Sequence, residues 1–105
     1  MQIQINTDGN IEGKERLAEQ VEAVVRDNLD RFSEQITRVE VHLSDENSDQ
    51  KSGTDDKRCV LEARLAGLQP IAVSHEAVTV EQAVDGAAEK MVRSLDGTLW
   101  RLRGR

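Results

Sequence analysis

Three side chains have the chemistry of a catalytic or metal-binding group: His42, His75 and Cys59. The histidines fall on different predicted strands, and neither lies in an H-x-x-x-H pattern or beside a C-x-x-C pair, so no third ligand stands at metal spacing. Alternation places His42 outward beside Glu40, and His75 and Cys59 inward. A lone inward cysteine is typical of a small buried apolar residue. The sequence therefore predicts no catalytic residue, no metal and no cofactor.

A second set of residues suits contact with a polyanion. Lys90, Arg93 and Arg101 fall at i, i+3 and i+11 of a predicted helix, within about 80° of one another at about 100° per residue. This row points about 135° away from the apolar stripe of the same helix, so we expect its cations to reach a ligand. Trp100, the single tryptophan, lies near Arg93 on the helical wheel. An exposed indole beside guanidinium groups indicates a partner.

A purely structural explanation of this row stays open. Cations in the last turns of a helix are favoured by its macrodipole, by about 0.3–1 kcal/mol each. Trp100 has the alternatives of folding back over a loop or of mediating a dimer contact.

The charge is unevenly distributed. Fourteen Lys and Arg stand against twenty Asp and Glu, a formal net charge of −6, and residues 1–56 alone carry −8 while residues 57–105 carry +2. Glu15, Glu19, Glu22 and Asp30 form an outward acidic stripe on the predicted first helix, interrupted by Arg26, and this stripe repels phosphate. Contact with nucleic acid is therefore expected at the basic carboxyl-terminal end.

Length and composition indicate one small domain, residues 1–105, of 37% hydrophobic and 32% charged residues. No stretch approaches the ~18 apolar residues that a membrane span needs, and no signal segment is visible at the amino terminus. One cysteine fits a reducing compartment, so we expect a cytoplasmic protein.

The hydrophobic periodicity switches along the chain between the period of a strand and that of a helix. Strands are predicted at 2–6, 36–43, 58–65 and 71–74, and helices at 13–32 and 79–102. Residues 44–56 contain no apolar side chain and are expected to form a flexible acidic loop. This order predicts an α+β fold, β-α-β-β-β-α, in which a four-stranded mixed sheet carries both helices on one face.

Several segments together resemble one family. They are Met1-Gln2-Ile3-Gln4-Ile5, Asn10-Ile11-Glu12, Leu29-x-x-Phe32 followed by Ile36-x-x-Val39-x-Val41-x-Leu43, Cys59-x-x-Glu62 before a glycine turn, and Ala83-x-x-x-Ala87-x-x-Lys90-x-x-Arg93-x-Leu95. In these features the chain resembles the ribosome hibernation-promoting factors, also called ribosome-associated inhibitor or protein Y. It is similar to the short forms, as a divergent acidic member.

The resemblance implies a non-enzymatic, bacterial-type translation inhibitor that acts under stress. Such a protein enters the channel between the ribosomal subunits, lies on small-subunit RNA and occludes the sites of messenger and transfer RNA. By position, the basic contacts of the family fall on Lys90 and Arg93, with Arg101 and Arg103 extending the row. With Trp100, these residues form the predicted site for ribosomal RNA.

Other functions stay open from the residues alone. One is a protein-interaction module that uses the exposed sheet face, where Arg38, Glu40, Arg58 and Arg64 point outward. Another is a small hydrolase or metal enzyme built on His42. The same half-bare sheet leaves room for a weak homodimer.

Overall fold

The chain forms a layer of strands covered by a layer of helices in the computed structural model, which describes residues 1–8, 13–45 and 57–103. In chain order the elements are β1 (Gln2–Thr7), α1 (Lys14–Leu29), the short 3-10 turn η1 (Asp30–Phe32), β2 (Ile36–Asp45), β3 (Lys57–Leu65), β4 (Ile71–Ala77) and α2 (Val80–Leu102). This succession confirms the predicted β-α-β-β-β-α order and the α+β class.

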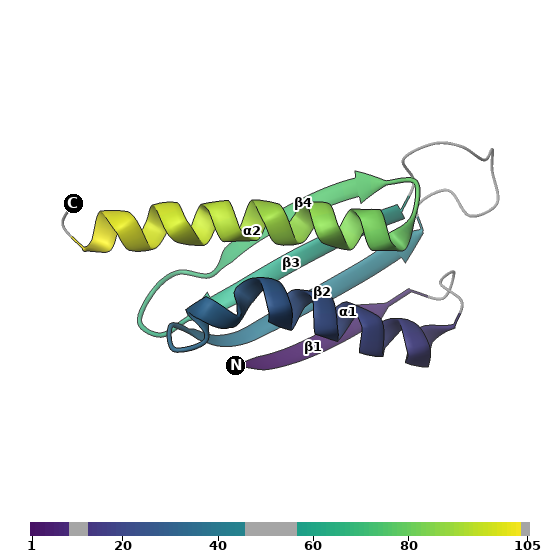
Figure 1. Cartoon of the computed structure of the whole chain (residues 1–105), viewed down its shortest axis with the longest axis horizontal. Helices are drawn as coiled ribbons and strands as arrows, with labels where there is room; N and C mark the ends of the chain where they lie inside the picture. Colours follow the sequence, from purple (N-terminus) through teal and green to yellow (C-terminus); the bar gives the residue numbers. More distant parts are fainter. Residues whose placement is uncertain (9–12, 46–56, 104–105) are drawn as a thin grey trace.

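The four strands make one mixed sheet in the order β1-β2-β3-β4 (Figure 1). β1 and β2 are parallel because α1 carries the chain back between them, whereas β2, β3 and β4 follow one another antiparallel. Residues with the same facing stand opposite each other across the strands. The inward rows pair Ile3 with Val39, Ile5 with Val41, Val41 with Leu61, Leu43 with Cys59, and Leu61 with Val73.

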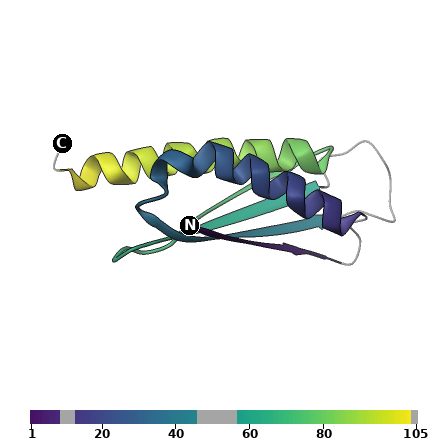
Figure 2. The ribbon, with the colours of Figure 1, turned by 60° about the horizontal axis from the view of Figure 1, so that its bottom comes forward.

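Both helices cover the same face of the sheet, and together with the inward rows they enclose the core (Figures 1 and 2). The fully buried side chains include Val25 and Leu29 of α1, Leu61 of β3, and Met91 and Leu95 of α2. No polar or charged residue in the described ranges is buried. The opposite face of the sheet is left polar, as the alternation predicts.

The ends of three predicted elements were wrong. The first helix stops being α-helical at Leu29 and continues as η1 to Phe32. Ser44 and Asp45 belong to β2, not to the predicted loop, because Asp45 donates its backbone N–H to Oδ2 of Asp8 at 3.3 Å and pairs with Lys57. The fourth strand extends from Ile71 to Ala77. Residues 46–56 of the predicted acidic loop lie outside the described residues.

Helix α2 is longer than the strands beneath it. Its 23 residues span roughly 34 Å at 1.5 Å per residue, against roughly 23 Å for the seven residues of β4. Its last turns therefore run past the end of the sheet (Figure 1). We call residues 97–103 the overhang. Leu102, predicted to continue the apolar stripe, is 57% exposed because no strand lies beneath it.

The start of α2 matches its predicted cap, since the Thr79 hydroxyl oxygen accepts the backbone N–H of Gln82 at 3.1 Å. Within the described ranges, neither helix combines the length and the apolar character that a membrane crossing requires.

His75 packs directly on the backbone of α2 at Gly86, where a β-carbon would overlap the imidazole ring. Gly86→Ala should therefore destabilise the protein by about 1–3 kcal/mol, although alanine is the better helix former. Gly97→Ala is the matched control, because its β-carbon would meet only the Arg101 guanidinium at 3.5 Å. It should raise stability by about 0.5–1 kcal/mol. Urea unfolding of the two variants checks the opposite signs.

Burial raises the pKa of the Cys59 thiol to about 12 from its usual 9.0. Because the folded state holds this proton more tightly than the unfolded chain, the stabilising effect is complete below pH 9. It is lost as the pH rises from 9 through 12, at up to about 1.4 kcal/mol per pH unit. Unfolding free energies measured over this range should fall less steeply for Cys59→Ala than for the wild type. Equal slopes would contradict this assignment.

Candidate nucleic-acid interface

The carboxyl-terminal half of α2, with its C-cap Arg103, carries all five side chains that the sequence predicts to bind RNA. The structure divides them into three groups. Lys90 lies against β4, Arg93 and Arg101 project from the helix surface, and Trp100 and Arg103 border a hollow at the end of the molecule.

Lys90 does not project freely, which corrects the prediction for this side chain. It is half-buried, and its Nζ donates a hydrogen bond of 2.8 Å to the backbone carbonyl of Ser74 in β4. A wheel drawn for α2 alone misses this contact, because the neighbouring strand supplies the acceptor. Lys90 therefore ties α2 to the edge strand, and only part of its charge faces solvent.

Arg93 and Arg101 behave as predicted in their exposure. Arg93 makes no side-chain hydrogen bond or ion pair with another residue of the described ranges, and Arg101 has only a long contact of 3.4 Å from Nη2 to the Thr98 hydroxyl. No carboxylate in those ranges neutralises either guanidinium. Both are available to phosphate oxygens, for which the planar guanidinium fork is well suited.

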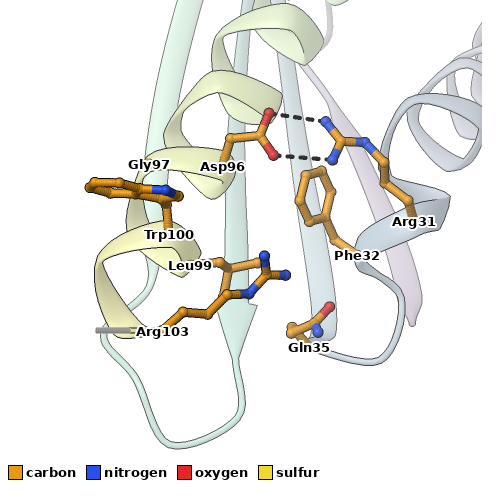
Figure 3. A pocket seen from close by; sticks show the side chains of 8 residues that line it. All are labelled: Arg31, Phe32, Gln35, Asp96, Gly97, Leu99, Trp100 and Arg103. Carbon is orange, nitrogen blue, oxygen red and sulfur yellow. Dashed lines mark hydrogen bonds and ion pairs between the residues drawn. The ribbon is translucent and has the colours of Figure 1, made fainter. Parts of the chain in front are cut away.

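Trp100 lies in the overhang and is 59% exposed. Its indole points away from Phe32 and Gln35, on the outer side of α2 (Figure 3). The predicted outward orientation is confirmed, and the alternative that the ring folds back over a loop is wrong. A large apolar ring gains little from facing water, so this position suits contact with a flat apolar partner.

A hollow of about 480 Å³ separates the overhang from η1 and the start of β2. It is lined by Arg31, Phe32, Gln35, Asp96, Gly97, Leu99, Trp100 and Arg103 (Figure 3). The overhang creates the hollow because α2 continues here without a strand beneath it. Trp100 and Arg103 stand on its α2 side, and neither Arg93 nor Arg101 lines it.

The far wall of the hollow consists of residues that sequence reasoning did not select. Both terminal nitrogens of Arg31 donate to the carboxylate of Asp96, at 3.1 and 3.0 Å, and Cζ lies 4.4 Å from the centre of the Phe32 ring. Hydrogen bonding to Asp96 raises the pKa of Arg31. Arg31 and Asp96 are 65 residues apart, so no local spacing could have predicted this pair.

The acidic stripe of α1 lies away from the basic side chains. α1 and α2 begin at the same end of the molecule and run side by side, so the first turns of α1, with Glu15 and Glu19, lie opposite the overhang (Figure 1). Glu22 is partly neutralised by Arg26, at 3.0 Å. The basic and acidic side chains thus occupy different ends of a molecule 49 Å long.

The residues considered for metal binding or catalysis have structural surroundings. His42 faces outward with Nε2 3.5 Å from Glu40, and His75 packs on Gly86. Cys59 is buried with the raised pKa described above. Across the described ranges, no three His, Cys, Asp or Glu side chains come together in a group fit to hold a metal.

Residues 3–102 match the family model described as sigma 54 modulation protein / S30EA ribosomal protein. The chain belongs to this family. The match extends from β1 to the end of α2 and includes four of the five predicted site residues, and it confirms the family resemblance drawn from the sequence motifs.

Solved structures agree with the family fold. The amino-terminal domain of protein Y from Thermus thermophilus superposes with a TM-score of 0.69 at 21% identity, over 90% of this chain and 94% of that one. A ribosomal subunit interface protein from Coxiella burnetii gives a TM-score of 0.69 at 18% identity, over 93% and 97%. No curated protein matches the sequence. By family and fold, the chain thus groups with ribosome-associated proteins.

The different surroundings of Lys90 and Arg93 predict different effects on stability. Lys90→Met keeps the aliphatic stem but removes the donor to Ser74, and should cost roughly 1–2 kcal/mol of unfolding free energy. Arg93→Met removes a side chain without a partner among the described residues, and should change stability by less than about 0.5 kcal/mol. Chemical denaturation of both variants measures the difference, and equal losses would refute the structural role of Lys90.

Proposed function

We propose that this protein is a non-enzymatic, cytoplasmic translation inhibitor that acts under stress. It binds small-subunit ribosomal RNA in the channel between the subunits, and it occludes the sites of messenger and transfer RNA. Arg93, Trp100, Arg101 and Arg103 make the RNA contact, and Lys90 contributes the exposed part of its charge.

One observation carries the proposal. The overhang and the turn before it present three guanidinium groups, of Arg93, Arg101 and Arg103, that no described carboxylate neutralises, beside an indole that is 59% exposed. Cations without intramolecular partners are free to replace the counterions of an RNA backbone, and the indole offers a face for an unpaired base. Family membership supplies the ribosome as the source of that RNA.

The net charge of −6 does not prevent such contact. At 1.5 Å per residue, Arg93 to Arg103 lie roughly 20–35 Å along α2 from its first turn, and the acidic first turns of α1 stand beside that turn. This separation exceeds the Debye length of about 8–10 Å at physiological salt. Repulsion from the acidic end is therefore largely screened at the basic end.

The test is co-sedimentation with purified ribosomes at low and moderate salt. The double variant Arg93→Glu, Arg101→Glu should bind at least about ten-fold more weakly at ~0.1 M salt, because two phosphate contacts become repulsive. Lys90 is left unchanged, since its loss would also affect stability. The melting curve of the double variant should stay close to that of the wild type.

The matched control reverses the same amount of charge on the exposed sheet face, as Arg58→Glu, Arg64→Glu. There Arg64 pairs with Glu62 at 3.7 Å and Arg38 pairs with Glu40 at 3.0 Å, so much of the charge is already neutralised within the sheet. This control should retain ribosome binding. Loss of binding in the sheet variant alone would overturn the proposal and favour a protein-interaction module on that face.

A further inference from the structure

The Arg31 guanidinium is held in a fixed place although it lies at the surface. Two hydrogen bonds to Asp96 fix its edge, and its Cζ lies over the Phe32 ring. The side chains of Arg31 and Asp96 nevertheless remain 60% and 53% exposed. An ion pair this exposed adds little to stability. What it does is hold a planar, charged group against an aromatic ring at the wall of the hollow.

The remaining wall of the hollow combines apolar and polar groups. Leu99 supplies a half-buried aliphatic surface, and Phe32 lies behind Arg31. Oε1 of Gln35 is buried and has no hydrogen-bond partner in the described part of the chain. Arg103 turns its guanidinium back over Leu99 toward Gln35 (Figure 3). A ligand that satisfies these groups needs a flat face, a hydrogen-bond donor on its edge and a nearby negative charge.

A nucleotide has all three features. Unstacked bases of single-stranded RNA lie on aromatic rings and on guanidinium planes, and proteins recognise their edges by hydrogen bonds. The amino group of a base would give Gln35 Oε1 the donor it lacks, and the adjoining phosphate suits a guanidinium such as that of Arg103. A free anion would leave the apolar wall unused, and an aliphatic peptide side chain would leave Gln35 unsatisfied.

We propose that this hollow binds one unstacked base of single-stranded RNA, with the base against Arg31 and Leu99, its amino group on Gln35 and its phosphate on Arg103. This inference rests on the proposed function and adds a base-binding site to the backbone contacts of Arg93 and Arg101. Arg31 and Asp96 act as a pair, because the carboxylate holds the guanidinium in position for the base. The volume of about 480 Å³ lies within the usual ~300–1,000 Å³ of small-molecule sites.

The experiment compares two fluorescein-labelled probes by anisotropy at low salt: hexaadenylate, and a hexamer with the same sugar-phosphate backbone but no bases. Wild-type protein should bind hexaadenylate about ten-fold more tightly. Arg31→Lys keeps the charge but loses the planar fork. It should bind the baseless hexamer as the wild type does, while its preference for bases falls to about three-fold or less, the remainder coming from Trp100.

A second variant separates stacking from charge. Asp96→Asn makes the protein less negative, so its affinity for the baseless hexamer should stay equal or rise. Its preference for bases should nevertheless fall, because Arg31 is no longer held by a carboxylate. Arg26→Lys is the matched control, since Arg26 is also exposed and ion-paired, to Glu22 at 3.0 Å, but lies outside the hollow. It should keep the full preference.

A wild-type protein without a base preference, or an Arg31→Lys variant with the wild-type preference, overturns the base site. These results differ from a failure of the proposed function, which appears as a protein that does not co-sediment with ribosomes. Co-sedimentation with an unchanged base preference in Arg31→Lys would retain the ribosomal role and remove the base site. A lost preference without co-sedimentation would do the reverse.

Discussion

The excess length of α2 over the sheet is the constraint on which the candidate interface depends. A helix that ended with β4 would have a strand beneath every turn, and its apolar stripe would be fully covered. Because α2 continues, Leu102 and Trp100 lie in solvent and the hollow opens between the overhang and η1. The ion pair of Arg31 with Asp96 bridges the two walls of that hollow. The core thus fixes the first turns of α2 and leaves the last ones for a partner.

The same geometry explains how an acidic protein can present a basic end. Opposite charges are separated along the long axis, and the helices that carry them run side by side from a common end. Within the sheet, by contrast, Arg38 and Arg64 are paired with glutamates two residues along their own strands. Net charge is therefore a poor guide to partners here, because the distribution places most of the unpaired described arginines at one end.

Local periodicity was sufficient to predict the elements and their order, since strand alternation and helical stripes are properties of neighbouring residues. The exposure of Trp100 and the burial of Cys59 followed from the same patterns. The contacts that modify the site came from elsewhere in the chain. Lys90 finds its acceptor on β4, and Arg31 meets Asp96 across 65 positions. Such partners depend on the packing of distant elements, which a helical wheel does not contain.

Trp100 gives the protein a built-in optical reporter. The sequence contains one tryptophan and no tyrosine, so its near-ultraviolet emission comes from a single indole at the rim of the hollow. The ring is mostly in water in the free state, and any partner that covers it changes the polarity around it. Occupancy of this end of the molecule can therefore be followed by intrinsic emission, without a dye and without altering the surface charge.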